Sequence, residues 1–152
     1  MDSVFDCITF FDENFLVNSR IEILKDTVDY FVICESQYDH RGNKKNINFK
    51  LNNKSFSRKV RHIVVEENFP NPEDRWGNEA YQREKLFLGI KDAKPDDLIL
   101  FSDSDEIPNP EVLKNLNLKN KFGIFMQRCF VYKLNIFNQY ESPWEGTRVC
   151  KK

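Results

Sequence analysis

Apolar runs of strand length alternate with stretches of helical spacing along most of this chain. Runs at residues 4–11, 28–36 and 60–67 are rich in β-branched and aromatic residues, which predicts three strands. The run at 28–36 is almost continuously apolar, which is typical of a strand covered on both faces in a parallel sheet. A fourth strand is predicted at 96–106, where apolar residues lead directly into acidic ones.

Helices are predicted between these strands. After Asp12, a candidate N-cap, apolar residues recur at approximately helical spacing as far as Leu24. A second helix is predicted over residues 78–93, with Asn78 as its N-cap. A short third helix is predicted over residues 109–116, because its second residue is a proline suited to a first helical turn.

The remaining segments complete an alternating pattern. Residues 37–46 and 68–77 are polar and rich in turn formers, which predicts loops. Residues 122–137 are β-rich, and residues 139–152 contain one more possible strand. Strands that alternate with helices predict an α/β fold with a mixed, mainly parallel sheet flanked by helices. Because no repeat or composition shift divides residues 1–152, a single domain is predicted.

Composition and charge narrow the classes of partner. The chain has 23 Lys and Arg against 24 Asp and Glu, so its overall charge favours neither nucleic acid nor a membrane surface. The first residues lack the basic and apolar regions of a signal peptide. No run reaches the roughly 20 apolar residues of a membrane span. A cytoplasmic protein without a transmembrane segment is therefore expected.

Three carboxylates crowd the tip of the fourth strand in the stretch SDSDE, namely Asp103, Asp105 and Glu106. In open α/β sheets, ligands bind beyond the carboxyl ends of the strands. If the chain stays extended here, Asp103 and Asp105 point to the same side. Adjacent carboxylates repel each other unless a cation joins them, and Mg²⁺ or Mn²⁺ suits such oxygen ligands and bridges them to phosphates. The alternatives are a solvated turn or a cap of the following helix.

Four blocks of the sequence, in order, resemble glycosyltransferase family 17. The blocks are FDCITFFDENFLVNSRIEIL, VDYFVICES, WGNEAYQREKL and ILFSDSDEIPNPEVL. The last is the most specific, because SDxDEIP is much longer than a bare Asp-x-Asp. Together the blocks cover approximately residues 5–113, with weaker similarity through Trp144. The family comprises β-1,4-mannosyl-glycoprotein β-1,4-N-acetylglucosaminyltransferases and their bacterial and viral relatives.

The resemblance implies a GT-A-like fold and a metal-dependent, inverting transfer from a UDP-sugar, UDP-N-acetylglucosamine in the family. It makes Asp105 the direct ligand of Mn²⁺ or Mg²⁺ in the catalytic site, and Asp103 a ligand of the metal or of the donor ribose. Glu106 belongs to the same motif, either binding the donor or orienting the loop. Arg83 pairs either with the donor diphosphate or with Glu79, four residues earlier.

Further donor-site candidates lie at the tips of the first two strands. In a GT-A-like fold, Phe10, Phe11, Glu35 and Ser36 would border the nucleobase. Core packing is the alternative for the two phenylalanines.

The chain departs from the family pattern after the acidic segment. Family members carry a further C-terminal portion, with a Gly-Trp-His stretch and a later His, so the family domain is expected to be incomplete here. An inverting transferase needs a general base to deprotonate the acceptor hydroxyl. After Glu111 the sequence offers only Glu141 and Glu145, and Glu145, beside Trp144, is the candidate base.

Three functions from different classes remain open. The intact SDSDEIP favours a glycosyltransferase that moves a sugar, N-acetylglucosamine by resemblance, from a UDP-sugar to a glycan or other hydroxyl acceptor. The absent C-terminal portion favours a catalytically incomplete nucleotide-sugar-binding or assembly module, completed by a homo-oligomer or another subunit. A nucleotidyltransferase is the third, although no Gly-rich phosphate loop supports it. The immediate start of the first strand, without a Golgi-type anchor, fits a bacterial or viral cytosolic protein.

Overall fold

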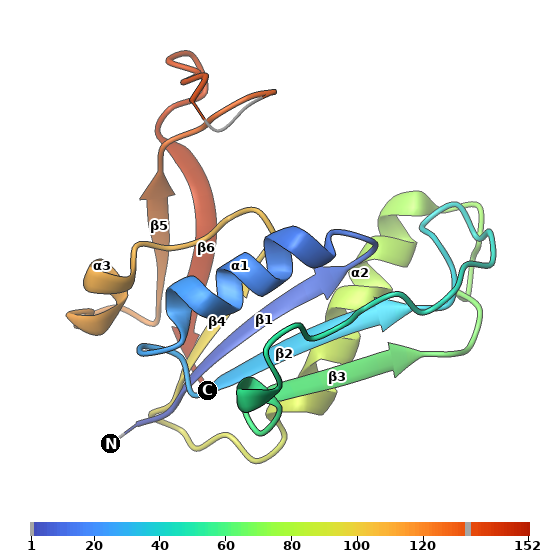
Figure 1. Cartoon of the computed structure of the whole chain (residues 1–152), viewed down its shortest axis with the longest axis horizontal. Helices are drawn as coiled ribbons and strands as arrows, with labels where there is room; N and C mark the ends of the chain where they lie inside the picture. The colour runs from blue at the N-terminus through green and yellow to red at the C-terminus, as the bar shows by residue number, and fades with distance from the viewer. Residues whose placement is uncertain (1, 133–134) are drawn as a thin grey trace.

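The strands form one six-stranded sheet in the order β3-β2-β1-β4-β6-β5 (Figure 1). The computed structural model describes residues 2–132 and 135–152. Its strands are β1 (Val4–Phe10), β2 (Tyr30–Ser36), β3 (Val60–Val65), β4 (Leu98–Ser102), β5 (Phe122–Gln127) and β6 (Trp144–Lys151). Strands β1 to β4 run parallel, and β6 lies antiparallel between β4 and β5. The predicted mixed, mainly parallel sheet is confirmed, and the order 3-2-1-4 is Rossmann-like.

Helical segments cover both faces of this sheet. They are α1 (Asn14–Leu24), α2 (Arg75–Lys85) and α3 (Pro110–Lys114), with the 3-10 helices η1 (Lys54–Phe56) and η2 (Leu86–Ile90). Helix α1 and the connection between β2 and β3 pack on one face, whereas α2 and η2 pack on the other (Figure 1). Alternate residues of β2 therefore enter different cores: Phe31 and Ile33 face α1, and Val32 and Cys34 face η2. The prediction that this strand is covered on both faces is confirmed.

The helix ends differ from the sequence prediction. Helix α2 begins at Arg75, because the side chain of Asp74 caps it by accepting a hydrogen bond from the Gly77 N–H at 3.0 Å. The predicted cap, Asn78, instead lies buried inside α2, where its amide donates to the carbonyls of two preceding loop residues. Asp12 does not cap α1 either, since that helix has no side-chain cap. The proline at the start of α3 lies in the first turn as predicted.

The C-terminal part of the chain is only partly strand. Strand β5 ends at Gln127, earlier than the β-rich run predicted, and beyond it Phe130 and Phe137 form an isolated bridge. Residues 133–134, inside that predicted run, lie outside the described residues. The strand expected within 139–152 is confirmed as β6. No helix in the described part of the chain has the length and apolar character needed to span a membrane.

Candidate active site

The carboxyl ends of β1 and β4 meet where the strand order reverses. After β1 the chain adds β2 and β3 to one side, whereas β4 lies on the other side of β1. In open α/β sheets, ligands bind in the crevice beyond the strand ends at this reversal. The register places Phe10 opposite Glu35, and Ile8 opposite Ser102, so these tips share one edge of the sheet.

The acidic segment, residues 103–106, forms a tight turn at this edge, here called the acidic turn. The Glu106 N–H donates to the Asp103 carbonyl at 3.1 Å, which closes the turn immediately after β4. The expectation of an extended chain, with two carboxylates alternating to one side, is therefore wrong. Asp103 and Asp105 are nevertheless both exposed to solvent on the turn.

Glu106 is turned inward and holds the acidic turn from within. Its side chain is buried; Oε1 accepts from the Trp144 indole at 2.8 Å, and Oε2 accepts from the Asp103 N–H at 3.1 Å. Both carboxylate oxygens thus have partners inside the protein. This placement matches the second of its two predicted roles, orientation of the loop, although a donor contact is not tested by it.

Arg20, which sequence reasoning missed, supports the acidic turn from below. Its guanidinium is fully buried and makes a two-pronged ion pair with Asp6, at 2.7 Å for both bonds. Nη2 also donates to the Ser102 hydroxyl at 2.9 Å. Nη1 donates to three carbonyls of the acidic turn, at 3.3 Å to Asp103, 3.4 Å to Ser104 and 3.0 Å to Glu106. One buried side chain therefore fixes the path of the backbone that presents Asp103 and Asp105.

Arg83 connects the acidic turn to helix α2. Its Nη2 donates to Asp103 Oδ1 at 2.5 Å and to Glu79 Oε1 at 2.7 Å. Partial burial opposes the charge, but the Glu79 and Asp103 carboxylates together raise the pKa of the Arg83 guanidinium above its usual value. The predicted pairing with Glu79 is confirmed, and the same guanidinium also contacts Asp103. A role toward a diphosphate stays a prediction.

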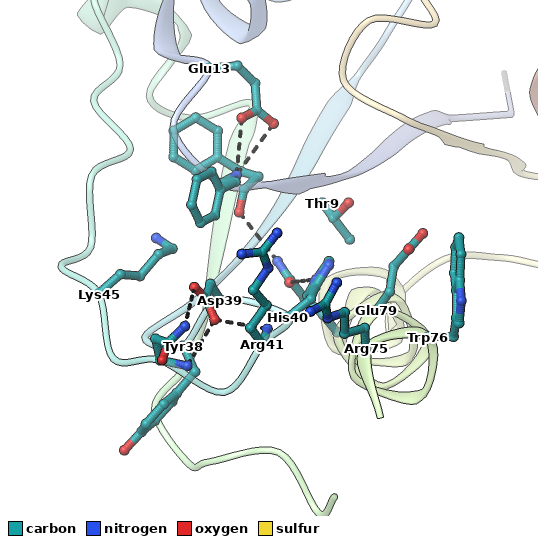
Figure 2. Close-up of a pocket in the computed structure, with 14 residues that line it drawn as sticks. Thr9, Glu13, Tyr38, Asp39, His40, Arg41, Lys45, Arg75, Trp76 and Glu79 are labelled. Carbon is teal, nitrogen blue, oxygen red and sulfur yellow. Dashed lines mark hydrogen bonds between the residues drawn. The ribbon is translucent and has the colours of Figure 1, made fainter. Parts of the chain in front are cut away.

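A cleft of about 650 Å³ opens beside these groups, at the tips of β1 and β2. Its size lies within the range of small-molecule sites. Figure 2 shows the loop after β2, with Asp39 and Arg41, on one side of the cleft, and Arg75, Trp76 and Glu79 of α2 on the other. We call it the strand-tip cleft. Among the described residues, the side chains of Arg41 and Arg75 form no ion pair, so both cations are available to an anion.

The amide of Gln82 fastens the wall of the strand-tip cleft. Its Nε2 donates to the carbonyl of Cys34 at 2.8 Å and to that of Phe10 at 3.4 Å. Its Oε1 bonds Nε2 of His40 at 2.8 Å. These contacts hold β1, β2, the following loop and α2 in fixed positions relative to one another, so the walls of the cleft are rigidly connected.

The residues predicted to border a nucleobase divide into buried and exposed groups. Phe11 is 55% exposed and lines the cleft, whereas Phe10 is 2% exposed and belongs mainly to the core. Ser36 is buried and accepts a hydrogen bond from the Tyr38 N–H at 3.0 Å. Phe11 is therefore the phenylalanine available to a ligand.

Glu35 is fully buried and serves the loop that follows β2. Its Oε1 accepts from Lys45 Nζ at 2.8 Å and from the Asn48 N–H at 2.6 Å. Its Oε2 contacts His62 Nε2 at 3.1 Å and accepts from the Phe49 N–H at 3.1 Å. With both oxygens occupied in this way, Glu35 shapes the connection to β3 and does not line the cleft.

Glu145, the candidate base, is exposed at the beginning of β6. Because β6 runs antiparallel to β4, its first residues lie at the same sheet edge as the acidic turn. Its neighbour Trp144 contacts Glu106 directly. The alternative carboxylate, Glu141, accepts a hydrogen bond from Cys129 Sγ at 3.6 Å. The pKa of the Cys129 thiol is raised, chiefly by burial and secondly by this hydrogen bond.

The oxygen ligands that the acidic turn offers show whether a divalent cation can bind there. No three His, Cys, Asp or Glu side chains converge as a metal cage among residues 2–132 and 135–152. Mg²⁺ commonly takes only one or two carboxylates, with substrate phosphates and water as its other ligands. Two exposed carboxylates on a fixed turn suit that open kind of site, but not a closed structural one.

Comparisons with known proteins agree on one family. The model of glycosyltransferase family 17 matches residues 1–148. The human and rat β-1,4-mannosyl-glycoprotein 4-β-N-acetylglucosaminyltransferases are each 33% identical in a 104-residue alignment that covers 61% of this chain and 19% of theirs. The chain thus spans about a fifth of the length of these curated relatives.

A solved structure also resembles this chain, at 11% identity and a TM-score of 0.42. It is a glycosyltransferase involved in the glycosylation of the major capsid of PBCV-1, and the match covers 99% of this chain and 60% of that one. Since the family model matches nearly every residue and the acidic turn lies within that match, the chain belongs to glycosyltransferase family 17.

Proposed function

We propose that this chain binds a UDP-sugar across the strand-tip cleft and the acidic turn, for metal-dependent, inverting transfer to a hydroxyl acceptor. This proposal rests on two exposed carboxylates, held in place by buried Arg20, that lie next to a cleft. The cleft contains two arginines that form no ion pair with any residue the structure describes. Family membership and the curated relatives support N-acetylglucosamine as the sugar and a glycan as the acceptor.

The strand-tip cleft suits the nucleotide part of the donor. The exposed ring of Phe11 offers a surface on which a base can stack, and aromatic stacking on bases is favourable whatever the base. Arg41 and Arg75 offer planar guanidinium groups that match phosphate oxygens in bidentate geometry. The diphosphate would then lie between the cleft and the acidic turn.

Asp103 and Asp105 would hold Mn²⁺ or Mg²⁺ at the acidic turn. When bound, such an ion neutralises the charge that develops on a departing diphosphate. Asp103 pairs with Arg83, which would place the Arg83 guanidinium beside the leaving diphosphate. Glu106 and Arg20 act indirectly, since they position the turn and do not project from it.

The acceptor hydroxyl would attack the anomeric carbon on the face opposite the diphosphate. Its oxygen forms the new glycosidic bond, while the bond from the anomeric carbon to the phosphate oxygen breaks and its electron pair leaves with the diphosphate. The hydroxyl proton passes to a general base. Glu145 is proposed for this role because it is exposed at the same sheet edge as the acidic turn.

Titration calorimetry of UDP and UDP-N-acetylglucosamine tests the donor site, with Mn²⁺ and then with a chelator. The wild type and Asp105→Asn would be compared with Asp26→Asn, an exposed carboxylate after α1 that serves as a control. We expect binding that needs Mn²⁺, is lost in Asp105→Asn and is unchanged in Asp26→Asn. Equal binding by all three proteins in chelator would refute the metal role.

A second candidate is a nucleotide-sugar-binding or assembly module that another subunit or a second copy completes. The observation in its favour is that Glu145, the candidate base, is not among the residues that line the strand-tip cleft. Radiolabelled donor separates the two candidates. Release of free sugar or transfer to a glycan, abolished in Asp105→Asn, supports the enzyme, whereas metal-dependent binding without either reaction supports the module.

A further inference from the structure

The near-neutral charge of the chain conceals one strongly basic segment. Residues 40–65 contain eight Lys and Arg but no Asp or Glu. Removing these eight charges from the formal net charge of −1 leaves −9 on the rest of the chain. Because the positive charge is concentrated in this one segment, the net charge of the whole chain does not reveal it.

The basic segment comprises most of the connection from β2 to β3 together with β3 itself, and its part before β3 lies against helix α1. Asn14 Oδ1 accepts from the Lys50 N–H at 2.7 Å, and Asn18 Oδ1 accepts from the Asn52 N–H at 2.8 Å. The amide nitrogens of the two asparagines donate to carbonyls of the same segment, at 2.8 and 2.9 Å. Helix and connection therefore form one continuous layer over a single face of the sheet (Figure 1).

Several cations of this layer point to solvent. Lys50, Lys54 and Arg58 are exposed, and none forms an ion pair with a carboxylate of the described residues. By contrast, Lys45 and Arg61 of the same segment pair with Glu35 and Asp92. The three unpaired cations thus have no evident role in the fold.

Apolar side chains of the same layer are also exposed. Phe15 is 83% exposed and Ile23 49% exposed, and both belong to α1. They line a shallow hollow of about 390 Å³ that Phe56 of η1 also lines. Glu22, the one carboxylate among its described lining residues, is engaged by Asn53 at 3.0 Å and by Lys25 at 3.6 Å. We call this surface the α1 face: Phe15, Ile23, Lys50, Lys54 and Arg58.

We infer that the α1 face docks on an anionic membrane surface. Peripheral binding of this kind combines apolar side chains that enter the headgroup region with cations that attract anionic lipids. The alternative polyanion, nucleic acid, would use the cations but has no use for an aliphatic side chain such as Ile23. The strand-tip cleft does not contribute to this surface, so the inference goes beyond the proposed function.

Vesicle co-sedimentation tests the inference, with phosphatidylcholine vesicles that contain or lack about a third phosphatidylserine. The charge variant is Lys50→Gln, Lys54→Gln and Arg58→Gln together. The matched control is Lys91→Gln, Lys94→Gln and Lys121→Gln, which removes three exposed lysines from outside the α1 face. An apolar variant, Phe15→Ser, completes the set, and circular dichroism verifies that each variant folds.

Wild type should bind the anionic vesicles and be released by 0.5 M salt. Each removed cation should lower the partition coefficient about fivefold, so the charge variant should bind about a hundredfold more weakly. The control should bind as wild type does, and Phe15→Ser should also bind less well. Equal loss in the control, or no binding to anionic vesicles, would overturn the inference. So would binding of a single-stranded RNA probe that the charge variant loses and Phe15→Ser retains, if vesicles are not bound.

Discussion

Substitutions at Arg20 should distinguish its effect on the unfolding free energy from its effect on the conformation of the acidic turn. The guanidinium is fully buried, and all of its N–H groups face Asp6, Ser102 or carbonyls of the turn. Arg20→Met leaves the Asp6 carboxylate buried without its partner. Breaking a buried pair in this way costs about 3–5 kcal/mol of unfolding free energy. That is a large part of the 5–15 kcal/mol typical of a domain.

The double variant Arg20→Met with Asp6→Val provides the decisive comparison. Because no charge is then buried, most of the lost stability should return, as apolar replacements of buried pairs are often neutral or better. The carbonyls of Asp103 and Ser104 still lose their shared donor, however. Affinity for UDP with Mn²⁺ should therefore stay about 10- to 100-fold below wild type, the usual effect of losing a group that positions metal ligands.

Urea unfolding and titration calorimetry on the same three proteins give both quantities. Wild type, Arg20→Met and the double variant should rank differently in the two assays: the double variant is stable but binds weakly. If the double variant regains both stability and affinity, Arg20 does not hold the acidic turn. If neither variant loses stability, Arg20 and Asp6 do not form a buried ion pair.

Two further predictions concern parts of the fold away from the proposed chemistry. A methyl group added at Gly89 would overlap Cγ1 of Val32, so Gly89→Ala should lower the unfolding free energy by about 1–3 kcal/mol, and adding Val32→Ala should recover part of it in urea titrations. Hydrogen bonds from Lys85 at 2.7 Å and Tyr81 at 3.0 Å lower the pKa of Glu67 to about 2. The ionised Glu67 carboxylate therefore stabilises the fold fully above its unfolded pKa of about 4.3, and this stabilisation is lost as the pH falls toward 2. Because Glu67 is solvent-exposed, wild type should lose only about 0.5 kcal/mol more than Glu67→Gln between about pH 5 and pH 2, and an equal slope for both proteins would contradict the assignment.

The sequence predicted the strands better than the polar contacts that organise the site. Continuous apolar runs such as that of β2 are local signals, and the sheet confirmed them. The sequence offers a turn at Asp103–Glu106 only as an alternative to an extended chain, because the shape of this turn depends on Trp144 and Arg20, which are distant in the chain. A local pattern cannot report such partners.

Arg20 itself left a signal that pattern reading could have used. It lies on α1 beside the apolar positions Val17, Ile21 and Leu24, all of which are buried. Asp6 interrupts the apolar run of β1 in the same way. Two opposite charges, each inside an otherwise apolar stripe, are best explained by each other, since a lone buried charge is costly. Glu35 shows the converse, because its place at a strand tip predicts a ligand group, whereas its buried carboxylate binds the loop after β2.

Gln82 makes the two halves of the site unequal in their response to solution conditions. The wall of the strand-tip cleft is fastened by an uncharged amide, whose bonds to two buried carbonyls neither titrate in the physiological range nor weaken with ionic strength. The link from α2 to the acidic turn is instead an exposed ion pair between Arg83 and Asp103, which dissolved salt screens. High ionic strength would therefore loosen the link to the acidic turn, while the strand-tip cleft keeps its shape.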